Sequence, residues 1–280
     1  EFRKEHGREK ISRAYGLFFY LEISERALYT CLSMKYILLC IIIFVAGFVD
    51  CIAGGGGLIS LPAYMIIGLP AHTAIATNKM SSSMGTAVST FRFIRKGYIN
   101  YKLGSVCILL ALIGSAAGAN IALMIPADFF TKIMLVILPI TAFYVLRPKS
   151  LRDDLPPLSA RKTMCLAGVS ALIIGIYDGF YGPGTGTFLI LLLNGLAHLS
   201  LKEANGITKI INLTTNLTSL AVYIYHGKTL IVLGMCAGVF GILGNWMGTI
   251  FFEKDTQKIV RSVMISVIVI FFIRNLSTLF

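Results

Sequence analysis

Two stretches of this chain follow one plan: FVAGFVDCIAGGGGLISLP at residues 44–62 and GIYDGFYGPGTGTFLIL at residues 175–191. Each stretch is apolar, carries one aspartate (Asp50 or Asp178), breaks at glycines and continues as a short apolar segment. A helix-like segment with a single lysine follows each copy, Lys79 in the first and Lys209 in the second, about 130 positions apart. The pattern predicts two repeated halves, each built around a glycine break.

The composition indicates a protein of the lipid bilayer. Hydrophobic residues make up 56% of the 280 residues and charged residues 14%, and the mean hydropathy is +0.80. A chain of this composition has too little polar surface for a soluble globule. A spanning helix needs about 20 predominantly apolar residues. Eight windows qualify, at residues 35–53, 72–94, 103–125, 129–147, 163–181, 204–225, 229–251 and 258–279. We therefore predict an all-α polytopic membrane protein with about eight transmembrane helices.

Two shorter apolar segments follow the glycine breaks, at residues 58–69 and 187–199. Twelve helical residues reach about 18 Å, whereas the hydrocarbon core is about 30 Å thick. We predict that both are re-entrant half-helices, which enter the membrane without crossing it. Non-helical backbone at that depth is tolerated only where it is buried in protein or faces a water-filled cavity. The glycine breaks therefore indicate an internal cavity, as in secondary transporters with repeated halves and broken helices.

The charged loops predict how the halves are arranged. We expect residues 34–147 to form the first transmembrane repeat, residues 148–162 a cytoplasmic linker and residues 163–280 the second repeat. Arg and Lys cluster at residues 92–102 and 147–162, which the positive-inside rule assigns to the cytoplasm. Four spans per half then give two halves of the same orientation, a parallel repeat, whereas five per half would invert them. A GxxxG spacing in each half, ending at Gly118 and at Gly248, predicts close helix packing.

Residues 1–33 fall outside this plan. Charged residues dominate there, and the first strong span opens at Met34. Because Glu1–Phe2 is what a common cloning restriction site encodes, we expect residues 1–33 to be a non-native or cytoplasmic N-terminal extension. The rival interpretation is an amphipathic helix on the membrane surface.

Several site classes find no support. The net charge of +12 comes from basic residues between apolar spans, not from an aromatic-interleaved patch, so we expect no nucleic-acid partner. The six cysteines show no CxxC spacing, so we expect neither a metal site nor a disulfide. No cofactor motif is present, because the glycine runs lack the lysine and hydroxyl residue of a nucleotide-binding loop.

Polar residues surround the two lysines. Lys209, Asn212 and Asn216 are spaced i, i+3 and i+7 and share one helix face. An ammonium with amide and hydroxyl groups, close to the positive N-termini of broken helices, favours a small oxyanion. The candidate substrate-binding residues are Lys79, Asn78, Ser82, Lys209, Asn212, Asn216, Gly55, Gly56, Gly57, Gly184 and Gly186.

Asp50 and Asp178 are candidates for coupling or gating, with a proton as the coupling ion. Intramembrane carboxylates usually face a polar interior and mark ion or substrate pathways. Two structural alternatives remain open. Each aspartate could cap the half-helix that follows it, or it could pair with one of the lysines.

These motifs together resemble the TauE/SafE permeases, also called the sulfite exporter or toluene-sulfonate uptake permease family, and most closely their YfcA-like branch. The resemblance rests on residues 44–62, 76–79 and 177–186 and covers the chain from about residue 35 to its end. It implies a multi-pass protein of the bacterial inner membrane that moves small sulfur-containing anions, such as sulfite or sulfonates, coupled to an ion gradient. Members of this family include exporters and importers, so the resemblance implies a substrate class and not a direction.

We expect no enzymatic activity, and two other classes remain as alternatives. A passive anion channel would also be lined by cationic side chains. An intramembrane aspartyl protease would need two membrane aspartates that share a proton. Tyr177–Asp178 fits one half of that pattern, but no glycine precedes Asp50 and no Pro-Ala-Leu is present.

Overall fold

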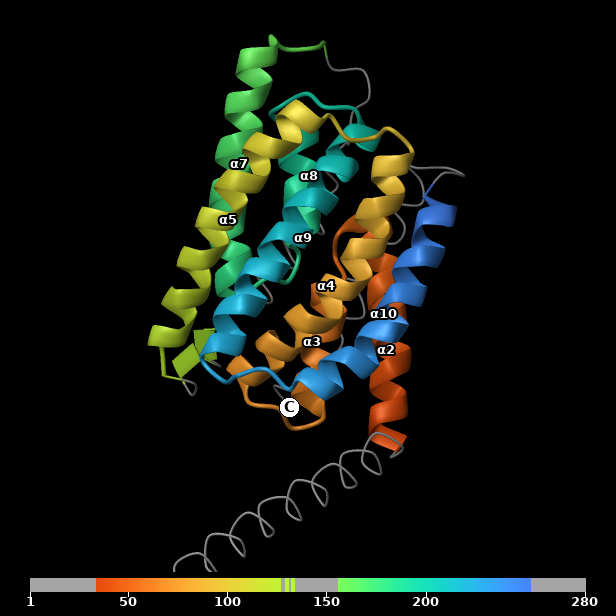
Figure 1. The fold of residues 1–280 in the computed structure, drawn as a ribbon, viewed down its shortest axis with the longest axis vertical. Helices are drawn as coiled ribbons and strands as arrows, with labels where there is room; N and C mark the ends of the chain where they lie inside the picture. Colours follow the sequence, from red (N-terminus) through yellow and green to blue (C-terminus); the bar gives the residue numbers. More distant parts are fainter. Residues whose placement is uncertain (1–33, 127–128, 131, 134–155, 253–280) are drawn as a thin grey trace, which may run out of the picture. The chain divides into compact units, whose positions relative to one another are not determined.

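The computed structural model of this chain describes residues 34–126, 129–130, 132–133 and 156–252 (Figure 1). The chain forms two compact units, residues 1–39 and 40–280, and the packing discussed below is that of the second unit. The helices in the described part are α2 (Met34–Ala53), α3 (Gly57–Ile66), α4 (Ala71–Arg95), α5 (Tyr101–Met124), α7 (Ala160–Phe180), α8 (Thr185–Gly195), α9 (Leu201–Tyr225) and α10 (Ile231–Phe251). The described residues contain no strand.

Six of the eight predicted spans fall on these helices, with bounds shifted by at most three residues. The window at 258–279, and all but the first few residues of the window at 129–147, lie outside the described residues. Four helices, α2, α5, α7 and α10, are long and apolar enough to cross a membrane. Helices α4 and α9 are each 25 residues long, but Ser, Thr, Asn and Lys fill much of their buried faces. The chain is therefore an all-helical, multi-pass membrane protein.

Side chains next to the helix ends fix where two helices begin. Ser200 and Glu203 form a capping box at the start of α9: the Ser200 hydroxyl accepts from the Glu203 N–H at 3.3 Å, and the Glu203 carboxylate accepts from the Ser200 N–H at 3.2 Å. At the start of α5 the Asn100 side chain accepts from the N–H groups of Lys102 and Leu103. Both caps satisfy N–H groups that a helix start leaves without intrahelical partners.

The helices of the second half repeat those of the first in order and in length. Helices α2 and α7 have 20 and 21 residues, α3 and α8 have 10 and 11, α4 and α9 have 25 each, and α5 and α10 have 24 and 21. The last helix of each set packs on the first helix of the other. A Cβ at Gly118 of α5 would lie 2.8 Å from the Phe180 nitrogen of α7, and a Cβ at Gly248 of α10 would lie 2.8 Å from the Phe48 oxygen of α2. The predicted close packing at the GxxxG motifs is confirmed.

The two halves are inverted, and the predicted parallel repeat is wrong. Helix α4 and its counterpart α9 lie against each other and run in opposite directions. Lys79 near the start of α4 bonds to Asn216 in the second part of α9, whereas Thr90 near the end of α4 bonds to the carbonyl of Lys209. Counterpart helices in a parallel repeat would run the same way, so this contact requires inverted halves.

Loop charge misled the prediction because it is distributed unevenly between the halves. The starts of α5, α7 and α9 meet at one end of the fold, where they line a shared cavity of about 180 Å³. We call this the basic end, because the ends of these helices and the loop from α4 to α5 contribute most of its charge: Arg92, Arg95, Lys96, Lys102, Arg161, Lys162 and Lys202. His226 and Lys228 follow α9 and so lie at the opposite end, although the parallel arrangement assigned them to the same side.

Candidate functional site

The two glycine breaks meet backbone to backbone. Gly54 opens the first break with φ of +71°, and a Cβ there would lie 2.6 Å from the Thr187 nitrogen. A Cβ at Gly186 would in turn lie 2.5 Å from the Gly54 Cα. Only glycine combines a left-handed backbone with so close an approach. The contact brings together the N-termini of the two short helices, α3 and α8.

Side chains of the second half satisfy the carbonyl groups at the broken end of α2. The Thr187 hydroxyl of α8 donates to the Ala53 carbonyl at 2.8 Å, and the Asn205 amide of α9 donates to the Ile52 carbonyl at 3.2 Å. The last carbonyl groups of a helix have no intrahelical partner, and leaving them unpaired inside a protein is costly. The polar residues that look out of place in α8 and α9 therefore stabilise the break of the other half.

Lys79 and Asp178 form a buried ion pair between the halves. The Lys79 ammonium lies 2.8 Å from Asp178 Oδ2, and the two side chains are only 3% and 6% exposed. The same ammonium donates to Asn216 Oδ1 at 3.1 Å. The Thr185 hydroxyl lies within hydrogen-bond distance of both Asp178 Oδ1, at 2.7 Å, and the Gly182 carbonyl, at 2.5 Å. Both carboxylate oxygens of Asp178 therefore have a partner.

Lys209 and Asp50 form the matching pair with a looser geometry. The Lys209 ammonium donates to the backbone carbonyl of Asp50 and lies 3.4 Å from Asp50 Oδ2. The Lys209 side chain is fully buried, whereas that of Asp50 is 19% exposed. Each lysine thus pairs with the aspartate of the other half, which confirms the ion-pair alternative. The capping alternative is wrong. The N-caps of α3 and α8 are Gly56 and Gly184, not the aspartates, and neither helix start has a side-chain cap hydrogen bond.

A central cavity lies where the breaks and the lysine helices converge. It offers about 30 Å³ to the centres of water molecules, enough for a few waters in this conformation. Nine predicted residues line it: Asp50, Gly57, Asn78, Lys79, Ser82, Asp178, Gly186, Asn212 and Asn216. They come from both halves and from six helices, α2, α3, α4, α7, α8 and α9.

Four predicted residues do not line the central cavity. Lys209 lies behind Asp50 and reaches the cavity only through that residue. Gly55 is in the first break, Gly56 lines a neighbouring cavity, and Gly184 caps α8 in a left-handed conformation with φ of +83°.

Sequence reasoning missed four lining residues: Gly54, Thr86, Gly182 and Thr185. A signal existed for Thr86, which follows Lys79 by seven positions as Asn216 follows Lys209. No comparable signal existed for Thr185, because its contact with Asp178 depends on how the break folds back.

The electrostatics of the cavity are balanced in this conformation. The N-termini of α3 and α8 contribute positive helix-dipole ends, and Lys79 contributes an ammonium. Asp50 and Asp178 oppose this charge. A small anion could bind here once a carboxylate releases its lysine or takes up a proton. In the part of the chain that the structure describes, no three His, Cys, Asp or Glu side chains gather to hold a metal ion.

Comparison with known proteins gives consistent matches. The family described as "Sulfite exporter TauE/SafE" matches residues 39–275. The "Probable membrane transporter protein ORF9" of a Sinorhizobium species is 31% identical over 84% of this chain and 89% of that protein. The "Probable membrane transporter protein YfcA" of Escherichia coli K12 is 32% identical over 82% of this chain and 87% of that protein. "Probable membrane transporter protein YdhB" of Bacillus subtilis is 25% identical over 78% and 89%. No solved structure matches.

Proposed function

The chain belongs to the sulfite exporter TauE/SafE family, and on that premise we propose that it is a secondary transporter, a permease for small anions such as sulfite or sulfonates. One observation carries the proposal: the Lys79 ammonium lies in a buried cavity, on which the N-termini of two short helices converge from the two inverted halves. A cation and two positive helix ends suit a small oxyanion. The location that we propose is the bacterial inner membrane.

We propose that α3 and α8 are re-entrant half-helices. They have 10 and 11 residues and so reach only about 15 Å, half of the hydrocarbon core. Their N-termini meet at the contact between Gly54 and Gly186, while each leads away to the start of α4 or α9. Because α4 and α9 are antiparallel, these starts lie at opposite ends. This arrangement supports two half-helices that enter from opposite sides and meet near the middle of the membrane.

The same geometry supports a repeat-based topology. Helices α2–α5 fit a first repeat at residues 34–147, and helices α7–α10 fit a second at residues 163–280, joined by a linker at 148–162. The positive-inside rule assigns the basic end to the cytoplasm. The linker leads into α7 at that end, which suits a cytoplasmic linker.

The proposed mechanism is alternating access with ion coupling. One half or a moving helix bundle rocks about the glycine breaks and exposes the central cavity to one side at a time. The anion takes the place of a carboxylate beside Lys79, and Asp50 or Asp178 takes up the coupling proton, which neutralises the charge that would repel the anion. Inverted repeats support this mechanism, because each conformation of one half is available to the other.

Two alternatives receive less support. A passive anion channel would need a continuous path, whereas the cavity is small and both lysines are held by carboxylates. A protease would need two carboxylates that share a proton, whereas Asp50 and Asp178 each face a lysine.

Ligand-induced stabilisation tests the anion site. The purified protein is screened with sulfite, sulfonates, thiosulfate and carboxylates for a rise in melting temperature. A ligand at 100 times its Kd should add about 2.7 kcal/mol to the free energy of unfolding. We expect a sulfur oxyanion to stabilise the protein, and the double variant Lys79→Gln/Asp178→Asn to lose the response. That variant removes both charges together and keeps the shapes. The matched control is Lys102→Gln at the exposed start of α5.

Proteoliposomes separate a transporter from a channel. We expect accumulation of the anion above its outside concentration when a pH or ion gradient is imposed. Equilibration without accumulation would favour the channel. No stabilisation and no uptake with any anion would overturn the proposed function.

A further inference from the structure

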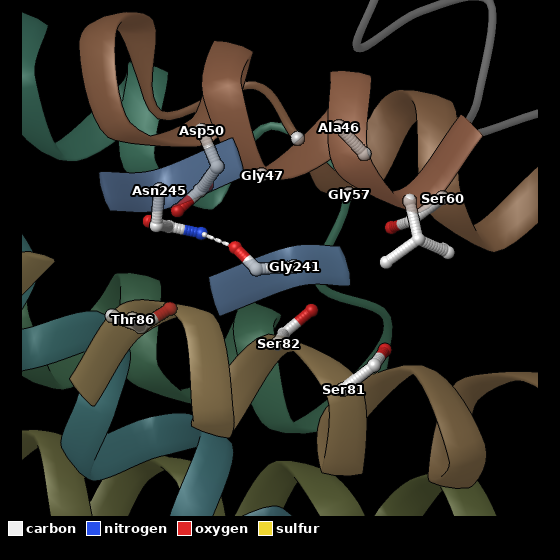
Figure 2. Close-up of a pocket in the computed structure, with 12 residues that line it drawn as sticks. Ala46, Gly47, Asp50, Gly57, Ser60, Ser81, Ser82, Thr86, Gly241 and Asn245 are labelled. Atoms are coloured by element: carbon white, nitrogen blue, oxygen red, sulfur yellow. Dashed lines mark hydrogen bonds between the residues drawn. The ribbon is translucent and has the colours of Figure 1, made fainter. Parts of the chain in front are cut away.

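A second, smaller cavity adjoins the central one and lies beside the first glycine break, between helices of the first half and α10 of the second half. Helices α2, α3, α4 and α10 enclose it, with about 20 Å³ available to the centres of water molecules. We call it the side cavity. Its polar side chains are Asp50, Ser60, Ser81, Ser82, Thr86 and Asn245. Figure 2 shows Asp50 and Asn245 entering this space from α2 and α10, with Ser82 and Thr86 facing them from α4. Asp50, Ser82 and Thr86 also line the central cavity.

Two buried oxygen atoms in the side cavity have no partner. Asn245 and Ser60 are each 3% exposed, and neither Asn245 Oδ1 nor Ser60 Oγ forms a hydrogen bond in the described structure. The orientation of the Asn245 amide is explained by its NH2 group, which donates to the Gly241 carbonyl at 3.1 Å (Figure 2). Its carbonyl oxygen is left as a free acceptor. Buried polar atoms in native proteins almost always have a partner, so these two call for one.

The two cavities share Asp50, Gly57, Ser82 and Thr86 but differ in their cationic lining. The central cavity is lined by Lys79 and by asparagine amides, which can donate to an anion. The side cavity has no lysine or arginine among its described lining residues. It offers a carboxylate, an amide oxygen and hydroxyl oxygens, and it lies between the last two turns of α2, the negative end of that helix dipole, and the N-terminus of α3. Oxygen atoms and helix C-terminal ends are what hold Na⁺ or a proton in transporters with broken helices.

The equivalent space beside the second break is closed. Ser115 follows Gly114 as Asn245 follows Gly244, and the Ser115 hydroxyl is bonded to the Thr215 carbonyl at 2.8 Å and to the Ser219 hydroxyl at 2.7 Å. Apolar residues stand at the positions that match Ser60 and Ser81 by the repeat offset. The free acceptors are therefore a property of the surroundings of the first break and not of the repeat.

From these contacts we infer that the side cavity is the binding site of the coupling ion, a small monovalent cation, Na⁺ or a hydrated proton, with Asp50 as its counter-charge and with Asn245 Oδ1 and Ser60 Oγ as the free acceptors of the cavity. The inference rests on the proposed transporter function and names the glycine break beside which the ion couples. Asp50 borders both cavities, so a cation on it weakens its hold on Lys209 and raises the positive charge beside the anion. Cation and anion then favour each other's binding.

The charged groups that face Asp50 are few. Lys209 faces it from α9, and Lys79 and Asp178 line the central cavity with it. Cys51 adjoins it on α2. Helices α3 and α10 contribute only neutral lining residues to the side cavity, and α4 contributes hydroxyls there.

The test compares Na⁺ and proton responses in matched variants. Na⁺ is titrated against choline at fixed ionic strength and pH, and the melting temperature of the full chain is followed. If the cation is Na⁺, we expect stabilisation by Na⁺ and at least a tenfold rise in the apparent Kd in Ser60→Ala and Asn245→Ala, since each removes an oxygen from a charged ligand. The control Ser115→Ala alters the position in α5 that matches Asn245 in the repeat and should keep the Na⁺ response.

If the cation is a proton, Na⁺ has no effect, and the pH at which proteoliposome uptake is half-maximal shifts in Ser60→Ala and Asn245→Ala but not in Ser115→Ala. Ser60→Ala removes one hydroxyl and serves where Asn245→Ala does not fold. The inference is overturned if Na⁺ has no effect and both pH profiles match that of the unaltered protein. It is also overturned if Ser115→Ala changes the response as much as the other two variants. If the anion is still taken up normally when these results are obtained, only the proposed cation site is refuted. If uptake is absent, the proposed transporter function is refuted.

Discussion

The two lysine–aspartate pairs occupy matching positions in the inverted halves, yet only one of them is closed. Lys79 and Asp178 approach to 2.8 Å, and Asn216 and Thr185 complete their hydrogen bonds. Lys209 and Asp50 are 3.4 Å apart, and the Asp50 side chain is 19% exposed. The difference follows from neighbours that the repeat does not copy. Gly57 stands where the second half has Thr185, and Thr86 stands where it has Asn216.

This asymmetry indicates a division of labour between the pairs. A carboxylate with both oxygens bonded holds its lysine firmly, whereas one with a free oxygen beside a small cavity can take up a cation. The closed pair would then fix the geometry of the anion site, and the open pair would respond to the ion gradient. The predictions below alter one pair or one break and leave its counterpart as the control, from the largest expected effect to the smallest.

The largest effect is expected where the two breaks touch. Gly54→Ala requires a left-handed backbone of alanine, which costs about 1–2 kcal/mol, and its Cβ would also overlap backbone atoms of Gly186. We expect loss of the folded protein, measured as monodisperse yield after extraction in detergent. Gly97→Ala is the control, because Gly97 has the same φ of +71° but nothing within 4 Å of its Cβ.

The second break, at Gly182, should tolerate a glycine-to-alanine substitution better than the first break does. A Cβ at Gly182 would lie 3.1 Å from Asp178 Oδ1 and 3.3 Å from Lys79 Nζ, the flexible ends of side chains. Gly182→Ala should therefore yield folded protein with impaired anion binding. Equal yields from Gly54→Ala and Gly97→Ala would contradict the backbone contact between the breaks.

Removing Lys79 should destabilise the protein strongly. Lys79→Ala leaves Asp178 buried without its counter-charge, and breaking a buried ion pair in this way costs about 3–5 kcal/mol. The measurement is the free energy of unfolding in detergent with denaturant. The double variant Lys79→Ala/Asp178→Ala removes both charges and should recover a large part of the loss. If the double variant is as unstable as the single one, packing and not charge explains the effect.

Removing Lys209 should cost less, about 1–3 kcal/mol for a group left without its partner, because the Asp50 side chain is 19% exposed whereas that of Asp178 is 6% exposed. Lys209→Ala is compared with Lys79→Ala under the same conditions. Equal losses would mean that the open and closed geometries do not differ in energy, and the proposed division of labour would fail.

Much of this architecture could be predicted from the sequence, because it rests on local composition. Six spans, both breaks and both short helices follow from apolar windows and glycine runs, and the ends of α4 and α9 lie within three residues of the predictions. The relative direction of the two halves could not be predicted, because the positive-inside rule had only small charge differences between loops to use, such as those of the loop around Lys228. The contacts of Lys79 with Asn216 and of Thr90 with the Lys209 carbonyl together settle it.

The site was predictable in its chemistry and not in its pairing. Lysine, asparagine and serine on polar faces of apolar helices indicate a buried site. Nine of the thirteen predicted site residues, glycines and aspartates included, line one cavity. The cross-pairing of each lysine with the other half's aspartate depends on how the halves interlock. Sequence also gave no sign of the side cavity, because Asn245 and Ser60 are single polar residues in apolar helices until α10 and α3 bring them together.

The smallest effect is expected from a substitution of Thr185, whose hydroxyl contacts the closed pair and has no counterpart at the open pair. Thr185→Val keeps the shape of the side chain but removes the hydrogen bond to Asp178 Oδ1, which should cost about 1.5 kcal/mol, the lower end of the range for bonds to charged groups, because Asp178 keeps Lys79. Thr214→Val is the control, because the Thr214 hydroxyl bonds only to the Ile210 carbonyl of its own helix. If the two variants lose the same stability, the Thr185 bond does not hold the pair closed. A larger loss in Thr185→Val, with weaker anion stabilisation, would mean that this hydroxyl is part of what makes the two pairs differ.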